Sequence, residues 1–188
     1  MAASESTGAP RVEPEVLAGE IKSDEPDART LTGVVGGAVA LFAAAFALFH
    51  IGTAAPFVGS FPDLIQRSVH LAFAFVLCFL LYPAWPGRSS SRRPTVLDAA
   101  LAAAALVALV YIIRHYDWIM ENPGDSTLTG VILGTMLTVL TLEAARRTIG
   151  LIFTALGVIA IAYAYLGASI PGAWGHRGFG WVTIQESL

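Results

Sequence analysis

The stretch 149–170 reads IGLIFTALGVIAIAYAYLGASI, 22 residues without a charged side chain. A helix of about 20 mostly apolar residues spans the hydrocarbon core of a bilayer. Inside lipid such a helix satisfies every backbone amide within its own segment. The stretch therefore predicts a membrane-spanning helix. A transmembrane β-barrel would instead show short alternating strands, and the sequence contains no such pattern.

Four more apolar runs precede this stretch, and each has the length of a membrane span. Charged residues make up only 13% of the 188-residue chain, about half the share found in soluble domains. We therefore predict an all-α integral membrane helical bundle. Its five predicted spans are residues 31–51, 64–82, 95–115, 126–145 and 149–170. Almost no loop separates the last two, so four spans plus an interfacial helix is the alternative.

The two ends of the chain differ from the apolar body at 31–170. Residues 1–30 contain three prolines, no aromatic residue and a net charge of −4. They cannot bury enough apolar surface to fold, which predicts a disordered acidic tail. Residues 171–188 are predicted to form a periplasmic or interfacial end. Residues 31–188 have a net charge of only +1, so no basic surface for nucleic acid is indicated.

The arginines indicate an orientation. The loop at 83–94 carries Arg88, Arg92 and Arg93, and Arg146 with Arg147 follows the fourth span. Basic residues in short loops favour the cytoplasmic side. With five spans these two arginine groups fall on the same side, together with the acidic tail. The N-terminus is therefore predicted to lie inside and the C-terminus outside.

Few ionisable residues lie within or beside the predicted spans, and these are the candidate sites, because ionisable groups are costly in lipid. Arg67 lies in the first turns of the second span, from which its side chain can reach the headgroups. Asp98 lies at the start of the third span, where the helix dipole favours a carboxylate. Glu143 and Arg147 have the i, i+4 spacing of an ion pair. We interpret Arg67, Glu143, Arg146 and Arg147 as structural or anchoring residues.

Histidine offers an alternative function, that of a small haem-binding membrane redox subunit. All four histidines are predicted near the outer side, and two histidines on facing helices can ligate a haem axially. They are His50, His70, His115 and His176. The single cysteine, Cys78, excludes an internal disulfide and a cysteine-based metal cluster. No catalytic set or metal motif is recognised, so neither an enzyme nor a resident cofactor is predicted.

Small residues indicate where helices might approach one another. Gly33 with Gly37, and Gly130 with Gly134, each form a G-x-x-x-G motif. Such spacing lets helix backbones pack closely in lipid. The alanine-rich third span would serve equally well. The pattern predicts helix packing rather than catalysis.

Three stretches together resemble the early membrane region of tripartite ATP-independent periplasmic (TRAP) transporter permeases. They are Arg67–Pro83 (RSVHLAFAFVLCFLLYP), Thr141–Gly150 (TLEAARRTIG) and Tyr163–Gly178 (YAYLGASIPGAWGHRG). The resemblance covers roughly residues 31–180. It is to the TAXI-associated type, in which the small and large membrane subunits are fused in one chain.

The resemblance implies a function that composition alone does not. Such transporters import organic acids with a sodium gradient, and a periplasmic TAXI-type solute-binding protein delivers the substrate. The large permease subunit carries the substrate and sodium sites, and the small subunit is a scaffold in the bacterial inner membrane. This chain is similar to the small-subunit portion plus the connecting helix, and it ends at Leu188, where the large domain of a fused permease begins. The partners implied are the large subunit, the binding protein and membrane lipid.

Overall fold

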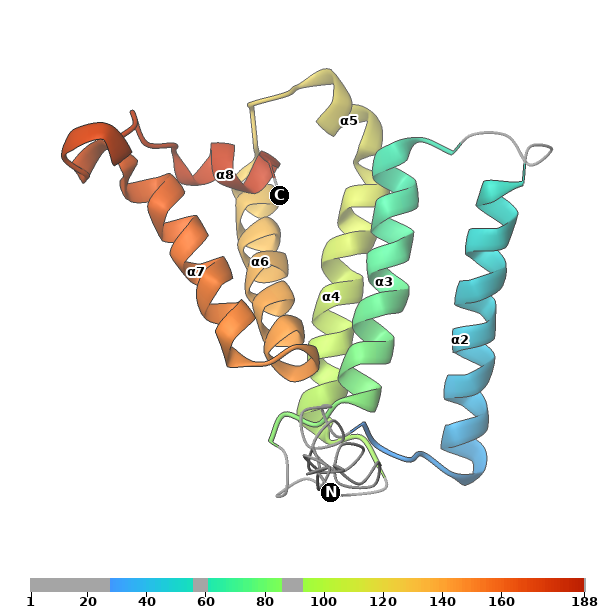
Figure 1. Cartoon of the computed structure of the whole chain (residues 1–188). Helices are drawn as coiled ribbons and strands as arrows, with labels where there is room; N and C mark the ends of the chain where they lie inside the picture. Colours follow the sequence, from blue (N-terminus) through green and yellow to red (C-terminus); the bar gives the residue numbers. More distant parts are fainter. Residues whose placement is uncertain (1–27, 56–60, 86–92, 188) are drawn as a thin grey trace, which may run out of the picture.

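The computed structural model describes residues 28–55, 61–85 and 93–187, which form helices and turns without a strand (Figure 1). The predicted tail therefore lies outside the described residues, except for residues 28–30. The α-helices are α2 (Gly33–Ala54), α3 (Asp63–Leu81), α4 (Val96–Arg114), α5 (Tyr116–Glu121), α6 (Leu128–Thr148), α7 (Leu151–Leu166) and α8 (Trp181–Ser187). Two 3₁₀ turns, η1 (Gly167–Ser169) and η2 (Gly172–Trp174), follow α7.

Five helices are long and apolar enough to cross a membrane, which confirms the all-α membrane bundle. They are α2, α3, α4, α6 and α7 extended by η1, and each matches one predicted span to within a few residues. The segment of α7 and η1 is about 30 Å long, the thickness of a hydrocarbon core. The structure thus favours five spans over four spans plus an interfacial helix.

The helices run alternately up and down, so the connections divide between two ends (Figure 1). The end of α3, the starts of α2 and α4, and the connection between α6 and α7 lie together at one end. We call this the turn end. The end of α2, the start of α3, the α4–α6 connection and α8 lie at the opposite end, which we call the α8 end (Figure 1). Of the arginines used for orientation, Arg93, Arg146 and Arg147 lie at the turn end, as five spans require, whereas Arg88 and Arg92 lie outside the described residues.

The core lies where α3, α4 and α6 meet. Phe75 and Phe79 of α3 stack with their ring centroids 5.9 Å apart, and they pack with Ala105 and Leu109 of α4 and Leu140 of α6. Alanines recur on the face of α4 that meets α3, because side chains three and four positions apart share one helix face. Small side chains there let the two backbones approach closely.

The glycine motifs do not make the helix contacts predicted for them. A Cβ added at Gly33 or Gly37 would meet no atom within 4 Å outside its own helix. A Cβ at Gly130 would meet the Thr127 side chain, and one at Gly134 would meet Gln185 of the short helix α8. Neither motif therefore joins two spans in the described part of the chain. The alanines of α4 do so instead.

The junction between α6 and α7 is a tight turn. The amides of Ile149 and Gly150 both donate to the carbonyl of Ala145, at 2.8 and 3.1 Å. Gly150 has φ +107°, a left-handed value that a residue with a Cβ rarely adopts. The chain therefore reverses within two residues, and α7 returns beside α6. Gly157 lets the helices meet near the turn, because a Cβ there would lie 3.0 Å from Leu142 Cδ2.

Helices α2 and α7 are peripheral, and neither contains a fully buried residue. Helix α2 contacts α3 through aromatic side chains, including Phe46 stacked on Phe73 at 5.2 Å. Helix α7 leans away from α6 toward the α8 end, and α8 lies across the space that opens between them (Figure 1). The wide apolar surfaces of both helices are therefore open to their surroundings.

Histidine 176 ties the segment after α7 back onto α7. Its Nδ1 accepts from the amide of Gly178 at 3.1 Å, so Nε2 carries the proton that it donates to the Tyr163 carbonyl, also at 3.1 Å. The amide of Phe179 donates to the carbonyl of Ala164 at 2.9 Å. A Cβ at Gly167 would overlap the imidazole ring. This close fit directs the chain back toward α6, where α8 forms.

Candidate functional site

The candidate site is a buried cluster of ionic side chains at the turn end, centred on Asp98. Thr95 and Asp98 form a capping box at the start of α4. Asp98 Oδ2 accepts from the Thr95 amide at 2.9 Å and from its hydroxyl at 2.8 Å, and the Asp98 amide donates to Thr95 Oγ1 at 3.3 Å. The box satisfies amides that the first turn of a helix leaves without partners. It thereby orients the carboxylate of Asp98.

Two arginines from distant parts of the chain bind this carboxylate. Arg29 Nη2 lies 2.6 Å from Asp98 Oδ2, and Arg147 Nη1 lies 2.6 Å from Oδ1. The exposed fraction of the side chain is 3% for Arg29 and 0% for Asp98 and Arg147. Both pairs are therefore shielded from water and lipid. They join the segment before α2 to the start of α4 and the end of α6.

The arginines also hold the end of α3, whose last carbonyls have no partner within the helix. Arg29 donates to the carbonyl of Leu80 at 3.0 Å and, more weakly, to that of Phe79 at 3.4 Å. Arg147 donates to the carbonyl of Tyr82 at 3.1 Å. Positive charge at a helix C-terminus is also favoured by the helix dipole. The cluster thus holds the ends of α3, α4 and α6 together.

Glu143 adds a second carboxylate to the cluster. Its Oε1 lies 2.7 Å from Arg147 Nε, and its Oε2 lies 2.7 Å from Arg146 Nε. Arg146 further donates to the carbonyl of Ala84 at 2.8 Å, beyond the end of α3. The predicted i, i+4 pair of Glu143 and Arg147 is confirmed, and Arg146 joins it at i, i+3.

The charges of the cluster are nearly balanced. Among the described residues, three guanidinium groups face two carboxylates, which gives these five side chains a formal charge of +1. The Arg147 guanidinium also lies 5.0 Å from the centroid of the Phe79 ring, a cation–π contact. Breaking a buried ion pair by removing one partner costs about 3–5 kcal/mol. The arrangement is suited to fixing helix ends rather than to proton transfer or nucleophilic chemistry.

The structure separates the four candidate residues into two groups. Glu143, Arg146 and Arg147 belong to the buried cluster. Arg67 lies at the α8 end, and its one ion pair with a described residue is with Asp63, at 2.6 Å, with both side chains about three-quarters exposed. An exposed pair of this kind contributes about 0–1 kcal/mol. Arg67 is therefore not part of the site.

The sequence did not predict the buried ion pairs that two residues, Asp98 and Arg29, make in the cluster. Asp98 was interpreted as a carboxylate at a helix start, which the capping box bears out, but its two arginine partners were missed. Arg29 was assigned to the disordered tail, whereas the structure buries it against α3 and α4. One signal was present: Asp98 and the Arg146–Arg147 pair are predicted on the same side of the membrane.

The histidines are only partly brought together. His50 Nε2 and His70 Nδ1 lie 2.8 Å apart across α2 and α3, whereas His115 stacks on Tyr111 of its own segment. An iron between two imidazoles would need nitrogens about 4 Å apart, since each metal–nitrogen bond is about 2 Å. The His50–His70 pair, as arranged, is a hydrogen-bonded pair and does not fit axial haem ligation. Among the described residues, no three His, Cys, Asp or Glu side chains gather as a metal site would require.

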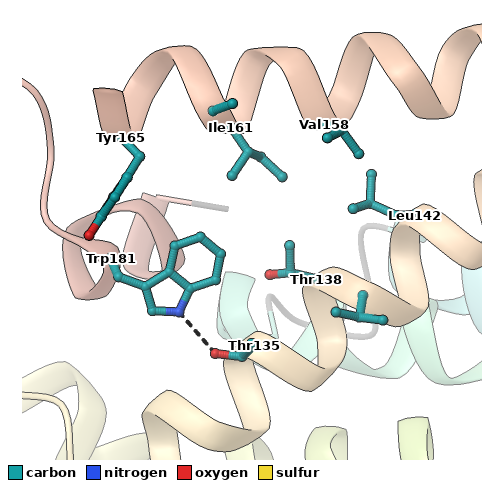
Figure 2. A pocket seen from close by; sticks show the side chains of 9 residues that line it. Thr135, Thr138, Leu142, Val158, Ile161, Tyr165 and Trp181 are labelled. Atoms are coloured by element: carbon teal, nitrogen blue, oxygen red, sulfur yellow. Dashed lines mark hydrogen bonds between the residues drawn. The ribbon is translucent and has the colours of Figure 1, made fainter. Parts of the chain in front are cut away.

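A second feature is an apolar groove of about 500 Å³ between α6 and α7. Figure 2 shows that side chains of both helices line it and that Trp181 of α8 stands at one end. Trp181 Nε1 donates to Thr135 Oγ1 at 3.0 Å, and this hydrogen bond fixes α8 over the groove. The groove lies toward the α8 end, away from the ionic cluster.

Comparison with known proteins identifies no relative. No family model, no curated protein and no solved structure matches the chain. The five spanning helices define the class of the chain as a multi-pass helical membrane protein.

Proposed function

We propose that this chain is the small membrane subunit, or N-terminal portion, of a TRAP-type permease. In this role it is a scaffold for a large subunit that performs sodium-coupled uptake of organic acids delivered by a periplasmic binding protein. The chain itself carries no catalysis and no cofactor, and sodium ions bind in the large subunit. The N-terminus lies in the cytoplasm and the C-terminus in the periplasm of a bacterial inner membrane.

The observation that carries this proposal is that the bundle has two parts. One part is a core of helices whose ends are fixed by buried ion pairs, and the other consists of peripheral helices with exposed apolar surfaces. The Asp98 cluster fixes the ends of α3, α4 and α6, which also share the buried core. Helices α2 and α7 expose apolar side chains along their length, including Leu41, Leu48, Ile152 and Ile159, each at least 60% exposed. A rigid core with apolar outer helices is what a scaffold needs to hold a moving partner.

The three stretches that resemble TRAP permeases support the proposal because they contain the turns and contacts that hold the helices together. The stretch 141–150 contains Glu143, Arg146 and Arg147 and the tight turn into α7. The stretch 163–178 contains the His176 hydrogen bonds that return the chain toward α8. The stretch 67–83 covers most of α3 and its C-terminal end, which the arginines bind. The motif residues thus have roles in holding the helices, as expected of a scaffold.

The test is an uptake assay in the host, with the gene for this chain deleted and then restored. Sodium-dependent accumulation of labelled organic acids should fall to background on deletion and return with the wild-type chain. Restoration with Arg147→Ala should recover much less uptake, because the cluster loses two ion pairs. Arg67→Ala is the matched control, since its pair is exposed, and it should recover full uptake. Unchanged uptake on deletion would contradict the proposal.

A further inference from the structure

We propose that the contact of His176 with α7 is a pH-sensitive switch, which holds the segment between α7 and α8 only while the imidazole is neutral. Backbone groups fix the roles of both ring nitrogens. Nδ1 faces the amide of Gly178, which can only donate, and Nε2 faces the carbonyl of Tyr163, which can only accept, each at 3.1 Å. The neutral imidazole with its proton on Nε2 satisfies both groups.

A second proton on the ring does not fit this arrangement. In the imidazolium form both ring nitrogens are donors, so the proton on Nδ1 would point at the N–H of Gly178. The protonated ring therefore loses the hydrogen bond from Gly178 and places two donors against each other. It keeps the bond to Tyr163, but one of its two contacts with the backbone is broken.

Turning the ring does not remove the conflict. A Cβ at Gly167 would lie 2.0 Å from Cε1 of His176, so the imidazole is seated directly against the backbone of η1. The rings of Tyr163 and Phe179 lie beside it, with centroids 4.8 and 5.5 Å away. A half-turn about the Cβ–Cγ bond would place carbon atoms where the two nitrogens lie, and both hydrogen bonds would be lost.

The groups around the ring offer no partner for a positive charge. On α7, the Tyr163 hydroxyl already donates to a backbone carbonyl at 2.8 Å. Arg177 is itself a cation, and its guanidinium lies 5.7 Å from the centroid of the Phe179 ring. Neither η1 nor residues 181–185 of α8 contain an ionisable side chain. In the part of the chain that the structure describes, no carboxylate forms an ion pair with His176.

The contact that protonation breaks is the one that returns the chain toward α8. Beside it, the amide of Phe179 donates to the carbonyl of Ala164 at 2.9 Å, and α8 begins two residues later. His176 is half-buried, so protons from water reach the ring. The switch therefore loosens the segment 175–180 as the pH falls. It rests on these contacts and not on the proposed transport function.

Hydrogen–deuterium exchange of the full chain in lipid nanodiscs, followed by mass spectrometry, tests the proposal. Exchange is measured at about pH 7.5 and about pH 5, on either side of the range in which an ordinary histidine titrates. Each rate is divided by that of an unfolded peptide at the same pH. The protection of the Gly178 and Phe179 amides should fall about tenfold at the lower pH, because one hydrogen bond is lost. In His176→Gln, whose side chain does not titrate, protection should be the same at both pH values.

His115 provides the matched control. Its Nδ1 lies 2.9 Å from the carbonyl of Tyr111 and donates to it, so a second proton on Nε2 leaves that bond in place. His115→Gln should therefore retain the pH-dependent loss of protection at Gly178 and Phe179. Equal protection of the wild-type chain at both pH values, or the same pH-dependent loss in His176→Gln, would overturn the proposal.

A second measurement applies if His176→Gln loses its helical circular dichroism. A chain in which the other three histidines are replaced by glutamine is labelled with ¹⁵N in the ring of His176, and the nuclear magnetic resonance signals of the two nitrogens are recorded. A proton on Nε2 and none on Nδ1 at about pH 7.5 supports the proposal. A proton on Nδ1 at that pH, in a neutral or a charged ring, would overturn it.

Discussion

Replacing Asp98 is expected to destabilise the bundle more than any other single change of a charged side chain. The carboxylate accepts four hydrogen bonds: one from Arg29, one from Arg147 and two from Thr95. Asp98→Ala removes the carboxylate that both Arg29 and Arg147 bind, leaves Glu143 as the carboxylate beside Arg147, and removes the helix cap. Loss of one partner of a buried pair costs about 3–5 kcal/mol. The ratio of folded to unfolded protein should therefore fall by about two to four orders of magnitude.

The assay is unfolding of the purified chain in mixed micelles with increasing dodecyl sulfate, followed by far-ultraviolet circular dichroism. Asp98→Asn has the same shape but removes the charge and keeps only one of the two oxygen acceptors, so it should cost at least about 1.5–3 kcal/mol. Asp63→Ala is the control, because it removes an exposed ion pair of the same type and should cost about 0–1 kcal/mol.

A double-mutant cycle separates the ion pair from the loss of the cap. Asp98→Ala and Arg147→Met, made separately and together, should show a coupling free energy of at least about 1 kcal/mol. The account would be refuted if Asp98→Ala cost no more than Asp63→Ala, or if the coupling were zero. Either result would mean that the cluster does not hold the helix ends.

Three further predictions concern the ionic cluster, the contact of His176 with Gly167 and the orientation of the chain in the membrane. Reversing the charge of Arg146 and Arg147 together should lower the membrane-inserted fraction of the chain, measured by carbonate extraction, because Glu143 and Asp98 then face like charges. Gly167→Ala should destabilise the chain by about 1–3 kcal/mol in the same unfolding assay, since the new methyl group overlaps the His176 ring. A cysteine at Asp125, in a chain with Cys78→Ser, should react with an impermeant maleimide added to intact cells.

Each of these predictions has a control. Arg67→Glu reverses one exposed charge at the α8 end and should leave insertion unchanged. His176→Ala should abolish the added cost of Gly167→Ala, because the overlapping ring is gone. A cysteine at Trp85, at the turn end, should react only after the cells are permeabilised. Labelling at Trp85 but not at Asp125 in intact cells would reverse the proposed orientation.

The helices were predictable because composition alone decides them. Within lipid a run of about 20 apolar residues has few alternatives to a helix, and the stretch 149–170 has no charge to break the pattern. The place of Asp98 at a helix start was predictable from the helix dipole, whereas the capping box with Thr95 was not predicted, although its contacts are local. The pair of Glu143 with Arg147 was predictable for the same reason, since one helix turn brings the two side chains together.

The cluster as a whole was not predictable, because its contacts depend on how the helices pack. Asp98 is separated from Arg29 by 69 positions and from Arg147 by 49, and no local pattern links them. The glycine motifs failed for a related reason. Small residues allow two helices to approach closely, but they do not determine which helix faces pack against each other. Here the alanines of α4 pack in the core with α3, whereas Gly33 and Gly37 approach no other helix in the part of the chain that the structure describes.

The most direct test of the scaffold role is a pull-down of this chain from its own host. The chain carries an N-terminal tag, is extracted in mild detergent, and its partners are quantified by mass spectrometry. The account predicts a large polytopic membrane protein in a stoichiometric amount, in a host that also makes a periplasmic solute-binding receptor. Recovery of the chain without any such membrane protein, under conditions in which the chain remains folded, would contradict the account.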